Sequence, residues 1–237
     1  MAHIHRFHVT DRAEPDAIVT LCGHEAHHAL NAVRVRPGDA VRLFDGQGWQ
    51  AEGTVARSSR REVEIEVTAA NHAPPPQYRL VLLQAGLNRE APLEELIRRC
   101  TEIGVTDFVF FRSKHSDRPP KRRDKWDRWA IESCKQCGRL WLPTIEACEN
   151  LEDALDGLPA PLLVATAALD PAPLRHGLDG MAATIAVGPE GDFHPDELAL
   201  LRQRGGRPIS LGPTVLRSEA AAVVASTLVL YEMGMLG

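Results

Sequence analysis

Two short segments near the C-terminal end of the chain each join an apolar run to a glycine-bearing turn and then to a helical pattern. Residues 184–187 lead into GPEGDF at 188–193, and residues 208–211 lead into the rest of LGPTVLRSE at 211–219. Glycine lets a backbone approach a ligand closely, and the first amides of a helix are free to donate hydrogen bonds. The pair therefore predicts one ligand pocket that is built largely from main chain.

The C-terminal two thirds of the sequence alternates strand-like apolar runs with helical patterns. Strands are expected at 80–84, 107–111, 162–166 and 184–187, and helices at 92–103, 121–139 and 220–236. This alternation is typical of a parallel sheet covered by helices, so we expect an α/β fold. A Rossmann dehydrogenase is disfavoured, because no G-x-G-x-x-G follows a strand. The apolar terminal helix is expected to build either an interface or a core.

The N-terminal part has a different pattern. Strands are expected at 4–9, 40–44 and 49–55, and a strict alternation at Val63, Ile65 and Val67 indicates a fourth strand, with one helical stretch at 24–33. These elements predict a small β-barrel. The proline-rich segment at 71–77 follows, and prolines stiffen a linker and cannot donate to a sheet. We therefore expect two domains, at 1–72 and 73–237.

The charge of the chain is unevenly distributed. A net charge of −5 argues against a nucleic-acid partner, because phosphate binding depends on clustered lysine and arginine. Between Arg112 and Arg128, however, eight basic residues stand against three acidic ones. From charge alone a solvated helix face is the favoured interpretation, with an RNA-binding surface as the alternative. Trp126 and Trp129 share one helix face in this stretch and are expected to pack in the core.

The sequence shows neither a recognisable targeting signal nor a disulfide pattern. No run of about 18 apolar residues is present, and the first residues lack the apolar segment of a secretory signal. We therefore expect a cytoplasmic protein without a membrane partner. The five cysteines are an odd number and are widely spaced, which does not indicate a disulfide framework.

Two groups of residues have side chains of the types that bind metal ions. Cys134 and Cys137 form a C-x-x-C, but no second pair completes a zinc site, so Cys137 is expected to pack in the core. His24, His27 and His28 share one helix face, for which a polar helix that caps the barrel is the favoured interpretation. We expect no metal.

Several motifs occur in the order found in one known family. GPEGDF and LGPTVLRSEAA, together with Phe44-Asp45-Gly46, TEIGV at 101–105 and QCGR at 136–139, resemble the RsmE-type ribosomal RNA uracil-N3 methyltransferases of the SPOUT superfamily. The resemblance implies a C-terminal trefoil-knotted α/β domain and a small N-terminal PUA-like β-barrel that binds RNA. It also implies a homodimer that methylates N3 of a uridine in 16S ribosomal RNA of the small subunit.

The cofactor implied by the resemblance is S-adenosyl-L-methionine. In this family the adenosine lies among the knot loops, which correspond here to the ends of three expected strands. The implied cofactor contacts are Leu163, Ala165, Thr166, Val187, Gly188, Pro189, Glu190, Gly191, Leu211, Gly212 and Leu216. Glu190 is expected to orient the cofactor or to serve the structure, because a carboxylate near a helix start commonly satisfies amides.

Uracil N3 carries a proton that must leave before or during attack. A guanidinium close by lowers the pKa of an acidic group by roughly 1 to 3 units, so an arginine can stabilise the uridine anion. Arg217 is the first catalytic candidate, Glu219 would orient it or accept the proton, and Arg6 is a second basic candidate from the small domain. HPDE at 194–197 is typical of a helix entrance, so His194 is expected to be a cap and Glu197 to complete a capping box.

RNA contacts are expected at basic positions in both domains: Arg34, Arg112, Lys114, Arg122 and Arg139. The chain departs from the family at Asp192, where glycine is frequent, and at Thr214, where arginine is frequent. Two alternatives remain open. One is a SPOUT enzyme that acts on another RNA or base atom, and the other is a non-catalytic RNA-binding protein of the same fold.

Overall fold

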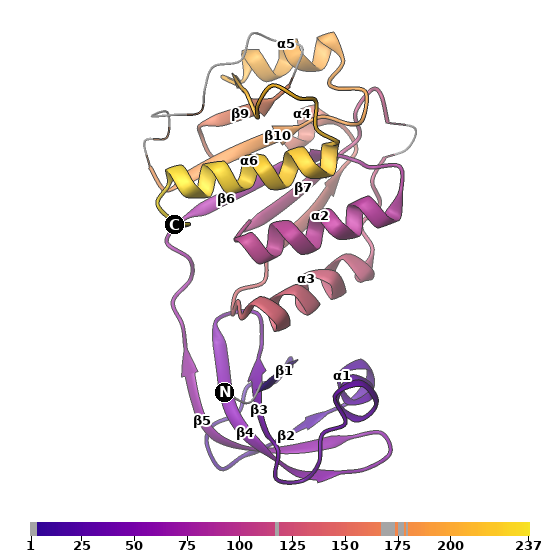
Figure 1. Cartoon of the computed structure of the whole chain (residues 1–237), viewed down its shortest axis with the longest axis vertical. Helices are drawn as coiled ribbons and strands as arrows, with labels where there is room; N and C mark the ends of the chain where they lie inside the picture. The colour runs from indigo at the N-terminus through magenta and orange to yellow at the C-terminus, as the bar shows by residue number, and fades with distance from the viewer. Residues whose placement is uncertain (1–3, 117–118, 167–173, 175–177, 179) are drawn as a thin grey trace. The chain divides into compact units, whose positions relative to one another are not determined.

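The computed structural model describes residues 4–116, 119–166, 174, 178 and 180–237. The chain divides into two compact units (Figure 1). The N-terminal unit comprises Met1–Pro76 and Ile131–Leu142, and the C-terminal unit comprises Gln77–Ala130 and Pro143–Gly237. The boundary falls within helix α3 (Asp124–Cys137), so one helix contributes residues to both units.

The N-terminal unit is a curled five-stranded sheet with the strand order β1-β3-β4-β5-β2. Its strands are β1 (His5–His8), β2 (Ile18–Leu21), β3 (Ala40–Phe44), β4 (Trp49–Ser58) and β5 (Val63–His72). The register between β4 and β5 shifts between Glu52 and Gly53 and again between Val55 and Arg57. Such bulges increase the local twist of a strand pair, which accounts for the curl.

The predicted alternation in β5 is confirmed, because Val63, Ile65 and Val67 are all fully buried in the core of this unit. The expected helix at 24–33 is divided into α1 (Gly23–His27) and a π-helical segment at His28–Val33. Strand β2 was not predicted. It is four residues long, and only two of its side chains are buried, so its periodicity is too short to recognise.

Gly48 and Gly38 provide a matched pair in this unit. Both have a positive φ, +95° and +94°, which disfavours any side chain by about 1–2 kcal/mol. A Cβ at Gly48 would lie 2.6 Å from the carbonyl oxygen of Ala73 and 2.7 Å from the Trp141 ring, whereas none of the described atoms lies within 4 Å at Gly38.

We expect Gly48→Ala to lower the free energy of unfolding by about 1–3 kcal/mol more than Gly38→Ala, because forcing an extra group into a packed site adds that cost. Urea denaturation of the two variants measures the difference. Equal losses of unfolding free energy in the two variants would mean that the backbone at Ala73 moves away from the added methyl group without measurable cost.

The C-terminal unit is built on a six-stranded parallel sheet with the order β11-β9-β10-β6-β7-β8. Its strands are β6 (Arg79–Ala85), β7 (Asp107–Phe111), β8 (Thr144–Cys148), β9 (Leu162–Ala165), β10 (Ala182–Val187) and β11 (Arg207–Ile209). The α/β expectation is confirmed, and the strands at 107–111 and 184–187 appear where the apolar runs predict them.

Helices cover both faces of this sheet, so alternate residues of β6 enter two different cores. Leu80 and Leu82 pack with α2 (Glu90–Ile103), α3 and α6 (Ser218–Glu232). Val81 and Leu83 pack with α4 (Leu151–Ala154) and α5 (Pro195–Gln203) on the other face. Trp126 and Trp129 of α3 are buried in the first core, as expected.

None of the helices in the described part of the chain is both long and apolar enough to cross a membrane.

Candidate functional site

Three strands of the parallel sheet end at the same level. Ala165 of β9 pairs with Val187 of β10 on one side and with Ile209 of β11 on the other. The chain therefore leaves the sheet at Thr166, Gly188 and Ser210 along one edge. The residues predicted from the two glycine segments and from residues 163–166 thus lie at neighbouring strand ends. The sequence predicts one pocket for the two glycine segments, but it does not give the strand order that places these loops side by side.

The predicted cofactor residues differ in exposure along these loops. Leu163, Ala165, Val187 and Gly188 are buried, and Thr166, Pro189, Leu211 and Leu216 are partly buried. Glu190, Gly191 and Gly212 are exposed. The strand ends thus form the floor of the site, and the loops supply its accessible part.

Hydrogen bonds join the two glycine segments. Ser218, the first residue of α6, donates its hydroxyl to the carbonyl oxygen of Gly188 at 2.6 Å. The Gln84 side chain at the end of β6 donates to the Ser218 oxygen at 2.9 Å and to the Ala85 carbonyl at 3.0 Å. Its own Oε1 is buried without a hydrogen-bond partner among the residues that the structure describes. Sequence reasoning missed Gln84, which looks like an ordinary residue of a buried strand.

Asp192 joins the end of β9 to the loop after β10. Its φ is +61°, a left-handed conformation that glycine adopts freely and that aspartate tolerates. The carboxylate accepts hydrogen bonds from the Thr166 hydroxyl at 2.9 and 3.1 Å and from the Phe193 amide at 2.8 Å. The departure from glycine therefore adds a connection between two loops of the site.

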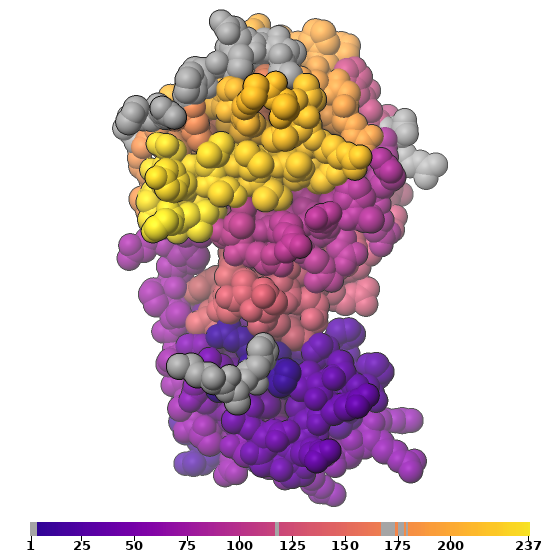
Figure 2. All heavy atoms as spheres, in the orientation of Figure 1, coloured from indigo at the N-terminus to yellow at the C-terminus, as the bar shows by residue number. Residues whose placement is uncertain are grey.

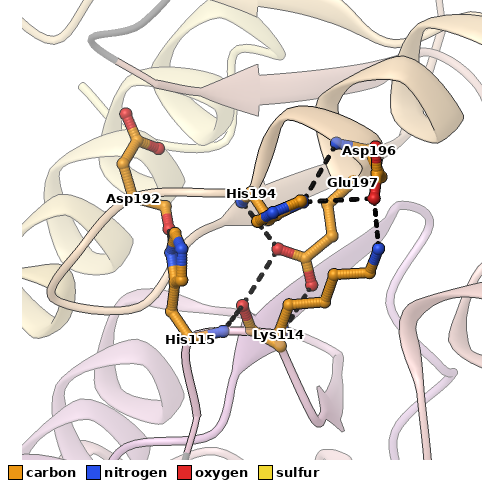
Figure 3. A network of polar contacts seen from close by, with 7 residues as sticks. Lys114, His115, Asp192, His194, Asp196 and Glu197 are labelled. Carbon is orange, nitrogen blue, oxygen red and sulfur yellow. Dashed lines mark hydrogen bonds and ion pairs between the residues drawn. The ribbon is translucent and has the colours of Figure 1, made fainter.

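A network around Glu197 braces the same loop from the other side (Figure 3). His194 caps α5 and forms the predicted capping box with Glu197, and Pro195 occupies the first turn. The Glu197 carboxylate is buried, with 5% of the residue exposed, and accepts from three donors. These are the Ser113 hydroxyl at 3.0 Å, the Lys114 amide at 3.0 Å and the His194 amide at 2.8 Å.

Other contacts extend this network. The His115 ring nitrogen Nδ1 lies 2.9 Å from the Asp192 carbonyl oxygen, and the rings of His115 and His194 meet edge to face at 5.6 Å. The Lys114 ammonium pairs with Asp196 and lowers the pKa of that carboxyl group. These contacts join the segment after β7 to residues 192–197, at the end of the loop after β10 and the start of α5 (Figure 3).

The loops fit the cofactor implied by the family resemblance. The amides of Gly191 and Leu216 have no acceptor within the described ranges, so they are free to donate to a ligand. Gly188 is packed so closely that an added Cβ would lie 3.1 Å from the amide nitrogen of Phe193. Leu211 and Leu216 supply partly buried apolar surface. Main-chain donors beside apolar walls suit a flat heteroaromatic ring with polar edges.

The catalytic candidates come from both units: Arg217 and Glu219 from the C-terminal unit, and Arg6 from the N-terminal unit. Arg217 is exposed at the N-cap position of α6, its side chain does not cap the helix, and Glu219 lies in the first turn. No ion pair joins Arg217 to Glu219 in the described structure. Arg6 belongs to β1 of the N-terminal unit, where its guanidinium lies 3.2 Å from the position of a Cβ at Gly138. Burial and the charge of Arg42 lower the pKa of Arg6.

The predicted RNA contacts also differ in their surroundings. Arg112 is exposed after β7, and Lys114 is paired as described. Arg122 donates to both oxygens of Asp127, which raises its pKa, and to the carbonyl of Ile145 at 2.7 Å. Arg34 is exposed with a φ of +62° and Arg139 is half-buried, both in the N-terminal unit. Asp117 and Arg118 of the basic segment lie outside the described residues.

Cys134 and Cys137, and a group of side chains around His24, are the potential metal ligands in the described structure. Cys137 is exposed, so its expected packing role is wrong, and Cys134 is the buried member of the pair. A hydrogen bond with Cys137, together with burial, raises the pKa of Cys134. His24, Glu25 and Glu132 come within 4.8 Å of one another, but the Lys135 ammonium bonds both carboxylates at 3.1 and 3.0 Å. The positive charge of Lys135 thus neutralises the two carboxylates that a metal ion would need as ligands.

Comparison with known proteins gives matches over both units. The model of an RNA methyltransferase domain matches residues 74–230, and that of an RNA methyltransferase PUA domain matches residues 21–68. Ribosomal RNA small subunit methyltransferase E of Synechocystis sp. is 29% identical over 89% of this chain and 72% of its own length. The protein of the same name from Mycobacterium tuberculosis is 27% identical over 92% and 88%.

Solved structures agree with these sequence matches. The Neisseria gonorrhoeae ribosomal RNA small subunit methyltransferase E bound to S-adenosyl methionine superposes with a TM-score of 0.86 at 25% identity. The match covers 97% of this chain and 98% of that one. The expected SPOUT-type α/β fold with a PUA-like N-terminal part is thereby confirmed.

Proposed function

Because the chain belongs to the RNA methyltransferase family, we propose that it methylates N3 of a uridine in 16S ribosomal RNA with S-adenosylmethionine as the methyl donor. The observation that most supports this proposal is the convergence of three strand-end loops at one sheet edge, with free main-chain donors beside apolar side chains. Relatives named for small-subunit ribosomal RNA match over most of the chain, which favours this substrate over transfer RNA.

The residues of this chain have distinct parts in the proposed reaction. When bound, S-adenosylmethionine supplies an electrophilic methyl group. Main-chain donors of the 188–191 and 211–216 loops hold the cofactor, and Leu163, Ala165, Thr166 and Val187 form the base of its pocket. Arg217 stabilises the uridine anion at N3, because an adjacent guanidinium favours the charged form of an acidic group. Glu219 orients that arginine or takes up the proton, and Arg6 is a further basic contact to the RNA.

The proposal assigns different roles to the N-terminal and C-terminal parts of the chain. Residues 1–72 bind RNA, and residues 73–237 bind the cofactor and carry out the transfer. Arg34 of residues 1–72 contacts the ribosomal RNA, and so do Arg112, Lys114, Arg122 and Arg139 of residues 73–237, of which Arg139 belongs to the N-terminal compact unit. We expect this to take place in the cytoplasm, where ribosomal subunits are found.

A homodimer is also part of the proposal, and α6 offers a surface for it. The buried side of this helix carries Ala222, Ala225 and Val229. Its other side and the segment after it expose Leu228, Tyr231 and Met235, with exposed fractions of 37%, 61% and 39%. The yellow C-terminal segment that contains α6 lies on the surface in the view of Figure 2. Exposed apolar clusters of this kind commonly mark protein interfaces. Sedimentation equilibrium of the full chain measures the oligomeric state, and a monomer would exclude this part of the proposal.

The test is methyl transfer to small ribosomal subunits from a strain that lacks this protein, followed by nucleoside analysis. We expect labelled S-adenosylmethionine to yield N3-methyluridine in 16S ribosomal RNA. Methylation of another base atom or of transfer RNA would retain the enzyme class and reject the substrate. Cofactor binding without any methylated product would indicate a non-catalytic RNA-binding protein.

A further inference from the structure

A cavity of about 510 Å³ lies in the C-terminal unit, between the segment after β6 and the start of α3. Its apolar wall consists of Leu87, Leu93, Phe110 and Trp126. Four basic residues line it, Arg89, Lys121, Arg123 and Lys125, against a single acidic one, Glu90. The volume falls within the roughly 300–1,000 Å³ of small-molecule sites. The cavity thus combines apolar and cationic surface and suits an anionic ligand with a flat apolar part.

The charges of this cavity are only partly neutralised. Lys125 pairs with Glu90 and lies 5.4 Å from the centre of the Trp129 ring. Lys121 and Arg123 are exposed and form no ion pair with any described residue. The hydrogen bond from Lys125 and also the charge of Arg123 lower the pKa of Glu90, so Arg123 is partly neutralised. An anionic group that enters the cavity therefore meets two cations that no close ion pair holds. Phosphates are bound by such clusters of lysine and arginine.

The buried part of the wall has an unsatisfied donor. Trp126 is 3% exposed, and its indole Nε1 has no hydrogen-bond partner in the part of the chain that the structure describes. Buried donors without acceptors are uncommon and cost stability. Phe110 is also fully buried, so Leu87 and Leu93, which are partly buried, supply the accessible apolar surface of the cavity.

The cavity adjoins the loops proposed to bind the cofactor. Strand β6, which leads into the cavity at Gly86, pairs directly with β10, which leads into Gly188. In addition, the Arg89 guanidinium at the cavity lies 3.6 Å from the Glu190 carboxylate in the 188–191 loop. A group in the cavity is therefore held beside the cofactor loops, on the same carboxyl edge of the sheet.

From this arrangement we propose that the cavity binds an unpaired nucleotide of the substrate RNA next to the target uridine. Lys121 and Arg123 contact its phosphate, and the base lies against the partly buried side chains of Leu87 and Leu93. RNA-binding proteins commonly recognise splayed-out single-stranded nucleotides in this way. The proposal rests on the function proposed above, since it assigns a second RNA contact to the same enzyme.

The test compares Arg123→Met with Arg202→Met, and adds the double variant Lys121→Met/Arg123→Met. Arg202 is exposed on α5 in the same unit and lies outside the cavity, so the two single variants differ only in position. We expect the double variant to raise KM for small ribosomal subunits about tenfold or more, because contacts to a charged group are lost. KM for S-adenosylmethionine and the melting temperature should not change, and Arg202→Met should resemble the wild type.

A binding measurement keeps this test independent of catalysis. The probe is a single-stranded RNA oligonucleotide of 12 nucleotides that contains uridine, and its affinity is followed by fluorescence anisotropy across a salt series. Each lost phosphate contact should reduce the slope of log K against log salt by about 0.7. A wild type that binds the probe but makes no N3-methyluridine would reject the proposed function and retain the RNA site.

Two outcomes would overturn the inference. If the cavity variants and Arg202→Met bind the probe equally and show equal KM for subunits, the cavity does not hold RNA. If the cavity variants bind the probe normally and lose only their affinity for whole subunits, the occupant is a ribosomal protein segment instead.

Discussion

Arg217→Ala is expected to reduce the rate of methyl transfer by about 10²–10³-fold, with little change in affinity for S-adenosylmethionine. Removal of one group that stabilises a developing charge in an active site typically costs this much. Arg217 lies directly after the 211–216 loop and at the start of α6, and its side chain has no cap hydrogen bond to lose. The loss should therefore fall on kcat. Single-turnover rates with saturating subunits, together with calorimetric titration of the cofactor, measure the two effects separately.

Two further variants sharpen this result. Arg202→Ala removes an exposed arginine from α5 in the same unit and should leave the rate unchanged. Arg217→Lys keeps the positive charge without the planar guanidinium, so it should recover part of the rate. Arg217→Ala with normal kcat and a raised KM for subunits would show that the residue binds RNA and takes no part in the chemistry.

Glu197→Ala is expected to lower the free energy of unfolding by about 3–5 kcal/mol. The substitution leaves the Ser113 hydroxyl and the amides of Lys114 and His194 without their acceptor, and each unpaired buried donor costs about 1–3 kcal/mol, partly offset by water that enters. The same change removes half of the capping box of α5. Urea denaturation of wild type and variant gives the difference.

The matched controls for this variant are Glu197→Gln and Glu95→Ala. Glutamine retains one acceptor oxygen and the volume of the side chain, so it should cost less than alanine. Glu95 is exposed on α2 and should tolerate alanine within about 0.5 kcal/mol. A loss below about 1 kcal/mol for Glu197→Ala would show that water replaces the carboxylate and that the network does not hold the 188–197 loop.

Much of the C-terminal unit could be predicted from the sequence. The strand at Asp107–Phe111 and the capping box from His194 to Glu197 match their sequence patterns, and the helix expected at 220–236 is observed at Ser218–Glu232. In the N-terminal unit, the strand at Ala40–Phe44 matches its pattern as well. Strand β8 and helix α4, of five and four residues, were missed, because so few residues carry no recognisable period.

The candidate site was predicted less completely. The glycine segments and Arg217 were recognisable because their residue types are unusual at a strand end. Gln84 and Ser113 were not, since each is an ordinary polar residue until its partner is known. Ser218 lies 134 residues from Gln84, and Glu197 lies 84 residues from Ser113.

The sequence by itself determined the longer strands and helices and the capping box of α5, since helix caps and side-chain periodicity depend on residues only a few positions apart. Only the tertiary structure decided which strand ends become neighbours. The pairing of β6 with β10, and of β9 with both β10 and β11, depends on how the whole sheet packs against its helices. That strand order brings the three loops together, and it places Arg89 at the same cavity as Lys121, Arg123 and Lys125. Long-range packing, and not local preference, selects the strand order.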